Sequence, residues 1–140
     1  MAQLVRASLT TDVLSIAQLI ALVKDDSAGA IATFTGNVRN HDGGRQVTAL
    51  RYEIHPTAHE QITVIANSVI ESSEAIKVAL SHRYGAIEIG ESAFFVAVSA
   101  AHRASAFEIC SRLVDQIKAK LPIWKYQVFV DGTGEWVNSA

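Results

Sequence analysis

The sequence predicts an α+β fold in which a mostly antiparallel sheet packs against three helices. Segments with the character of strands often follow one another directly, in the order β-α-β-β-α-β-β-β-α-β-β. Consecutive strands favour antiparallel pairing over the strict alternation of a doubly wound sheet. The composition is that of a globular protein, with 49% hydrophobic and 19% charged residues. Because no repeat or Pro/Gly-rich linker divides the chain, we expect one domain over residues 1–140.

The first expected elements are a short strand and an amphipathic helix. Residues 4–9 have the composition of a strand. Apolar residues then recur at helical spacing through residues 13–23, which predicts a helix. Residues 10–12 carry side-chain oxygens that can cap its first turn.

Two strands and a second helix are expected next. Residues 29–38 mix small residues with apolar ones, as in a strand, and residues 40–45 form a polar, glycine-containing loop. Residues 47–54 alternate, and the largely apolar set should face the core: Thr48, Leu50, Tyr52 and Ile54. Pro56 then begins a helix with an apolar stripe: Ile62, Ile65, Ala66, Val69 and Ile70.

Further strands are expected at residues 76–84, between Gly85 and Gly90, and at residues 93–100. The last of these is an almost continuous apolar run, which is typical of a strand buried on both faces. It is either core or, if it lies at a sheet edge, an interface between subunits.

The third helix is expected at residues 104–120 and should end before Pro122. Its inner face is predicted to carry six residues: Ala106, Phe107, Cys110, Leu113, Val114 and Ile117. A long strand at residues 124–130 follows, with a turn at 131–134 and a segment at 135–137 that pairs back.

Several function classes are disfavoured by composition. A net charge of -2 gives no global basic field that would attract nucleic acid. No stretch approaches the ~20 apolar residues of a membrane helix, and the first ten residues lack the apolar core of a signal peptide. The single cysteine, Cys110, cannot form an internal disulfide and should be a buried core residue. We therefore expect a cytoplasmic protein with no nucleic-acid or membrane partner.

Three basic clusters lie at the ends of predicted elements: Arg39 with its neighbours, His102–Arg103, and Lys118 with Lys120 and Lys125. A helix N-terminus such as that at His102–Arg103 attracts anions, and an arginine there suits phosphate. The alternative is a solvated surface arginine. The histidines show no metal-ligand spacing, so no metal site is expected.

Lys118 and Lys125 flank a proline-broken turn that can bring them together. Two adjacent positive charges lower the pKa of a lysine, and a neutral lysine can act as a base or nucleophile. The alternative is that Lys118 only complements the helix dipole and pairs with Asp115 on the solvated face. Taken alone, the residues favour that alternative.

Six segments, taken together and in order, resemble the molybdopterin synthase large-subunit family. They are GAIATFTGNVRNH at 29–41, SHRYG at 81–85, GE at 90–91, SAAHRASAF at 99–107, IKAKLPIWK at 117–125 and EWV at 135–137. The resemblance implies an α/β-hammerhead type of α+β fold and a homodimer. Each protomer would bind one small ubiquitin-like sulfur-carrier subunit, giving a heterotetramer.

The resemblance also implies an activity that needs no cofactor. The C-terminal Gly-Gly of the carrier, as a thiocarboxylate, would reach a pocket on the large subunit. There it would sulfurate cyclic pyranopterin monophosphate in two steps, forming the dithiolene of molybdopterin.

Residue roles follow from the same resemblance. Lys118 would act as general acid/base or transient acyl acceptor, and Lys125 would assist proton transfer and hold charge. The positions matching those that bind the pterin phosphate are Arg39, His102 and Arg103. The positions flanking that pocket are Asn37, Val38, Tyr126 and Gln127.

The sequence departs from the family pattern at two positions of the presumed pocket rim. Asn37 stands where some relatives have lysine, and Gln127 where relatives often have glutamate. These departures leave a second hypothesis open, a non-catalytic homologue that binds the carrier or a pterin phosphate. A third is an unrelated phosphate-binding domain with a chance resemblance.

Overall fold

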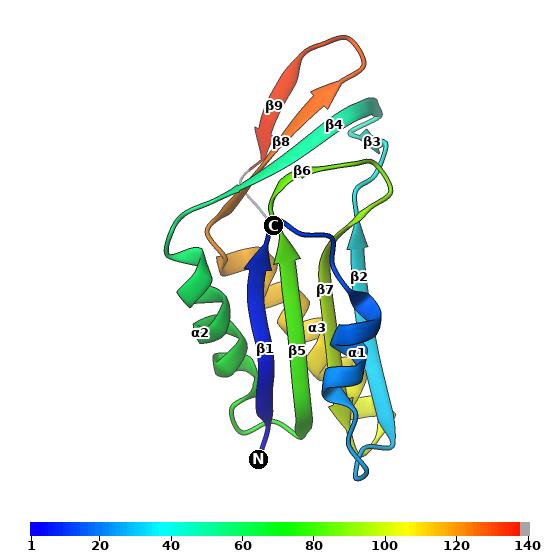
Figure 1. The fold of residues 1–140 in the computed structure, drawn as a ribbon, viewed down its shortest axis with the longest axis vertical. Helices are drawn as coiled ribbons and strands as arrows, with labels where there is room; N and C mark the ends of the chain where they lie inside the picture. Colours follow the sequence, from blue (N-terminus) through cyan, green and yellow to red (C-terminus); the bar gives the residue numbers. More distant parts are fainter. Residues whose placement is uncertain (138–140) are drawn as a thin grey trace.

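The structure is a computed structural model that describes residues 1–137 of the 140-residue chain. Within these residues, three helices and two sheets form the α+β fold that the sequence predicts (Figure 1). In chain order the elements are β1 (Gln3–Thr10), α1 (Ile16–Val23), β2 (Ala30–Asn37), β3 (His41–Asp42), β4 (Arg45–Ile54), α2 (Ala58–Ile70), β5 (Ala75–Arg83), β6 (Gly85–Ile87), β7 (Ser92–Ala100), α3 (Arg103–Lys120), β8 (Ile123–Phe129) and β9 (Gly134–Val137).

The first sheet has the strand order β1-β5-β7-β2. β1 pairs with β5 in parallel, and the other two pairings are antiparallel. One core cluster joins this sheet to α2 and α3, and a second, smaller cluster packs α1 against Ala79, Phe95 and Ala97 on the opposite face. β7 is therefore a central strand covered on both faces. Of the two expectations for residues 93–100, core is confirmed, because an interface would need an edge strand.

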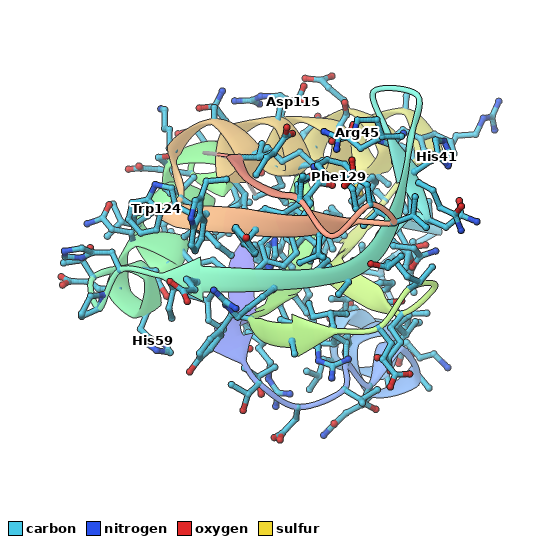
Figure 2. All side chains as sticks on the ribbon, turned by 90° about the horizontal axis from the view of Figure 1, so that it is seen from above. His41, Arg45, His59, Asp115, Trp124 and Phe129 are labelled. Atoms are coloured by element: carbon cyan, nitrogen blue, oxygen red, sulfur yellow. The ribbon has the colours of Figure 1, made fainter. Side chains whose placement is uncertain are left out.

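The second sheet lies across the upper end of the first (Figure 1). Its order is β3-β4-β8-β9, and β6 also pairs with β4. Seen from above, β8 and β9 lie on the α3 side of β4, and β6 lies on the α1 side (Figure 2). Arg45 fixes the far end of this sheet: its guanidinium lies 3.7 Å from the ring centre of Phe129 and donates to Thr133 Oγ1 at 2.6 Å.

A β-bulge in β4 overturns part of the predicted alternation. The register with β8 shifts between Val47 and Ala49, so one extra residue is inserted. Val47 and Leu50 are both buried as a result, whereas Thr48 is exposed and donates its hydroxyl to the carbonyl of Val128 at 3.2 Å. The expectation that Thr48 faces the core was wrong because the insertion shifts the two-residue period.

Two helix predictions also need correction. α1 begins at Ile16 rather than near Val13, which is 68% exposed. The backbone N–H of Asp12 donates to Thr10 Oγ1 at 3.0 Å, so these residues form a local turn and do not cap the helix. In α3, Phe107 is 66% exposed and Ile109 takes its place on the buried face.

Leu113, at the centre of α3, should be among the residues on which stability most depends. It is fully buried between the helix and the first sheet. We expect Leu113→Ala to lower the free energy of unfolding by about 2–5 kcal/mol, because the lost side chain leaves a cavity. The exposed neighbour Ser111 provides the control, since Ser111→Ala should stay within about 0.5 kcal/mol of wild type. Urea unfolding followed by circular dichroism measures both; equal midpoints would contradict the packing described here.

Candidate active site at the junction of the two sheets

Lys118 and Lys125 lie close together at the end of α3 and on the strand that follows. α3 ends at Lys120, and β8 begins after Pro122, so the chain reverses direction between them. Lys118 is exposed as a whole residue, yet desolvation of its amine and, second, the charge of Lys125 lower its pKa. The predicted proximity of the two lysines is thus confirmed. It increases the fraction of neutral Lys118 amine at neutral pH.

An aromatic cluster with a buried histidine lies beside these lysines. Lys125 is the cross-strand partner of Tyr52, and the Tyr52 ring meets His82 edge-on at 4.9 Å. His82 stacks on Phe94 at 5.1 Å and is only 1% exposed. Burial, against the opposing hydrogen bond to the Arg83 carbonyl and with a smaller contribution from the charge of Lys118, lowers the pKa of His82 to about 4.

The hydrogen bond of His82 fixes the form of its ring. Nδ1 lies 2.8 Å from the carbonyl oxygen of Arg83, so the proton of the neutral ring is on Nδ1. Nε2 then carries a lone pair, which makes His82 a neutral proton acceptor near Lys118. His82 lies within the SHRYG segment of the family resemblance, but the sequence predicts no role for it. Its signal was a single histidine at the end of an apolar strand.

His82 should make the stability of the protein depend on pH. Its folded pKa of about 4 lies below the ordinary value of 6.5. Between these values the unfolded chain binds a proton that the folded chain does not, so stability is full above pH 6.5 and falls toward pH 4. We expect a loss of about 3 kcal/mol in the free energy of unfolding across this window.

Denaturant unfolding at several pH values measures this effect. His82→Gln should flatten the dependence, whereas the exposed His59 provides a matched control and His59→Gln should leave it unchanged. An unaltered slope in His82→Gln would assign the acid sensitivity to carboxylates instead.

A third group joins the site from the β3–β4 hairpin. Gln127 Nε2 donates to Asp42 Oδ2 at 2.6 Å, and Arg39 Nη2 lies 3.5 Å from Asp42 Oδ1. The Gln127 hydrogen bond has the largest effect and lowers the pKa of Asp42 against desolvation, and the charges of Lys125 and Arg39 lower it by smaller amounts. Arg39, Asp42, Lys125 and Gln127 therefore share one region. Sequence reasoning did not single out Asp42, which lies within its polar loop at residues 40–45.

The other flanking residues have different surroundings. Asn37 Oδ1 accepts from the hydroxyl of Ser92 at 3.0 Å, and the buried Val38 exchanges backbone hydrogen bonds with Gly90 and Glu91. They anchor the end of β2 to the turn before β7. Tyr126 packs on Trp136 at 4.9 Å. Because successive side chains of a strand alternate, Tyr126 faces away from its neighbours Lys125 and Gln127.

His102 and Arg103 lie at the opposite end of α3 from Lys118. A separation of 118 − 103 = 15 residues corresponds to roughly 22 Å along a helix. His102 and Arg103 line a cavity of about 590 Å³ with Gly29, Ala30, Ala101 and Ala104. Gly29 is required there, since a Cβ would lie 2.5 Å from the Ala101 carbonyl oxygen. Within one chain, His102 and Arg103 therefore do not join the lysines, whereas the third predicted phosphate-binding residue, Arg39, lies in the same region as Lys125.

Other features of residues 1–137 bear on the function classes. No group of three or more His, Cys, Asp or Glu residues in this part of the chain is placed to hold a metal ion. None of its helices is both long enough and apolar enough to cross a bilayer. Cys110 is buried, as expected, and burial raises the pKa of its thiol to about 11.

Comparison with known proteins identifies the family. The MoaE protein family matches residues 9–120. The chain belongs to the MoaE family. The match confirms the resemblance inferred from the sequence motifs and excludes a chance likeness. It includes Arg39, His102, Arg103 and Lys118, whereas Lys125, Tyr126 and Gln127 lie beyond it.

Two curated relatives are each described as a molybdopterin synthase catalytic subunit. The protein of Oryza sativa subsp. indica is 42% identical over 120 residues, which are 85% of this chain and 62% of that protein. The protein of Thermoplasma volcanium is 40% identical over 119 residues, covering 84% of this chain and 87% of that protein. The chain thus spans less than two thirds of the plant relative and most of the archaeal one.

Solved structures of MoaE relatives have the same fold. The molybdopterin synthase of Staphylococcus aureus superposes with a TM-score of 0.86 at 27% identity, covering 94% of this chain and 96% of that one. The MoaE protein of Burkholderia ambifaria gives 0.80 at 29% identity, covering 99% and 90%. A chain from the complex of subunits 1 and 2 of the Helicobacter pylori molybdopterin-converting factor gives 0.68 at 18% identity, covering 98% and 88%, which supports the fold alone.

Proposed function

We propose that this protein is the catalytic subunit of a molybdopterin synthase. It would transfer sulfur from the C-terminal thiocarboxylate of a small ubiquitin-like carrier to cyclic pyranopterin monophosphate, forming the dithiolene of molybdopterin. The observation that carries the proposal is the proximity of Lys118 and Lys125, beside the Arg39–Asp42 pair. Membership of the MoaE family and the descriptions of its relatives support it.

For each sulfur transferred, the carrier's sulfur forms a bond to a substrate carbon, whose bond to oxygen breaks, and that oxygen leaves on the phosphate or as water. The sulfur must also be released from the carrier's acyl carbon. Water supplies the oxygen of the carboxylate that the carrier keeps, so the acyl–sulfur bond breaks while a carbon–oxygen bond forms. Lys118 is the residue suited to take the proton of that water, or to attack the acyl carbon itself, because its pKa is lowered. Lys125 supplies positive charge to the oxyanion that develops.

One chain brings only one of the three predicted phosphate-binding residues to the lysines. Arg39 lies on the lysine side, whereas His102 and Arg103 lie roughly 22 Å away along α3. We therefore propose a homodimer in which His102 and Arg103 of the partner subunit complete each site. Two apolar side chains near this end of α3 support contact with a second copy: Phe107 is 66% exposed, and Ile31 on β2 is 39% exposed.

The proposed partner is the small sulfur carrier, two copies of which would bind the dimer. The Helicobacter pylori chain that shares this fold is described as part of a complex of subunits 1 and 2 of the molybdopterin-converting factor, and we propose a two-subunit assembly of the same kind for this protein. We place the reaction in the cytoplasm, consistent with a single, buried and unpaired cysteine.

Product formation tests the proposal directly. The protein is incubated with cyclic pyranopterin monophosphate and a carrier bearing a C-terminal thiocarboxylate, and molybdopterin is detected by mass spectrometry. We expect product with this carrier and none with a carrier that ends in an ordinary carboxylate. Carrier binding without any product would favour a non-catalytic binding homologue instead.

A further inference from the structure

A carboxylate and an amide form a close pair beside the two lysines. Gln127 is only 3% exposed, and its Nε2 donates to Asp42 Oδ2 at 2.6 Å. The same nitrogen lies 3.5 Å from Glu135 Oε1 on β9. The two hydrogens of the amide thus face two carboxylates from different strands. A glutamate at position 127 would place a third carboxylate beside those of Asp42 and Glu135, with no hydrogen-bond donor between them.

This geometry gives the amide of Gln127 a defined partner. That partner is the carboxylate of Asp42, which lies on the β3–β4 hairpin. The partly buried hydrogen bond between the amide and the carboxylate holds the negative charge in a fixed position.

We propose that Asp42 is a positioning residue of the sulfur-transfer site, where its carboxylate, held by Gln127, orients Arg39 toward the substrate phosphate and provides the counter-charge for Lys125. The inference rests on the proposed function. Its geometric basis is that one carboxylate uses separate oxygens for Gln127 and for Arg39.

Stability alone does not account for this arrangement. The Arg39 side chain is 62% exposed, and ion pairs at such positions contribute little to stability. The Gln127–Asp42 hydrogen bond, in contrast, joins residues 85 positions apart and holds the hairpin against β8. An oriented guanidinium beside an open surface is suited to binding an anion in a fixed geometry.

Exchanging the positions of the Asp42 carboxylate and the Gln127 amide provides the test. Gln127→Glu creates the repulsion between carboxylates, and Asp42→Asn removes the anion. The double variant Asp42→Asn with Gln127→Glu restores one amide and one carboxylate in reversed positions. Glu53→Gln is the control, because Glu53 is an exposed carboxylate on β4 that pairs with Arg51 and not with Gln127 or Arg39. Two quantities are measured: the dissociation constant for cyclic pyranopterin monophosphate, and kcat and KM for product formation.

We expect each single variant to weaken ligand binding and kcat/KM by about tenfold. The double variant should recover to within about threefold of wild type, and Glu53→Gln should match wild type. If the Asp42–Gln127 pair only stabilised the fold, variants with the same unfolding midpoint would not differ in ligand binding or turnover, and the double variant would have nothing to rescue. Single variants that bind and turn over normally, or a double variant no better than the worse single one, would overturn the inference. A wild-type protein without turnover contradicts the proposed function, and ligand affinity then still decides the role of Asp42.

Discussion

Lys118→Ala is expected to abolish sulfur transfer, with a loss in kcat of at least about 10³-fold. The amine of Lys118 has a lowered pKa, so it is the group at the site best suited to accept a proton or attack an acyl carbon near pH 7. No neighbouring side chain takes over this role easily. His82 is buried and stacked between Tyr52 and Phe94, and Lys125 is held on β8 opposite Tyr52.

Single-turnover assays with thiocarboxylated carrier measure this loss, and calorimetry measures carrier binding. Carrier affinity should remain within about threefold of wild type, because a docking interface spreads its energy over many residues. Lys120→Ala is the matched control, since Lys120 is also exposed in the last turn of α3. Turnover retained in Lys118→Ala, or lost equally in both variants, would contradict the role given to Lys118.

The elements could be predicted because each has a local cause. Apolar periodicity places α2 and α3, and the continuous apolar run identifies β7 as a doubly covered strand. Errors arose where a local feature changes the period. The bulge at Thr48 shifts the alternation of β4, and the turn at Thr10–Asp12 delays the start of α1. Neither feature has a signature in hydropathy alone.

The site was only partly predictable, for a different reason. The sequence brings Lys118 and Lys125 together because only a short turn separates them. The Asp42–Gln127 hydrogen bond joins residues 85 positions apart, so no local pattern reveals it. The stacking of His82 on Phe94 likewise depends on the pairing of β5 with β7. Such contacts follow from topology, which a single sequence specifies only through the complete fold.

Combining two different inactive subunits in one dimer is expected to restore a large part of the sulfur-transfer activity. If His102 and Arg103 act in the site of the partner subunit, homodimers of Lys118→Ala and of Arg103→Ala should both be nearly inactive. A heterodimer of the two variants contains one site with both residues intact and one site with neither. Purified through two different tags, it should therefore recover about half of wild-type activity.

A reciprocal heterodimer gives the opposite result and is the sharper control. Here one subunit is wild type and the other carries both Lys118→Ala and Arg103→Ala. If each site takes residues from both subunits, each of the two sites in this heterodimer lacks one of them, so activity should be nearly absent. Sites confined to single subunits would give half of wild-type activity in this heterodimer and none in the first one. The roughly 22 Å between Arg103 and Lys118 within one helix favours shared sites, because one small pterin phosphate cannot bridge that distance inside one chain.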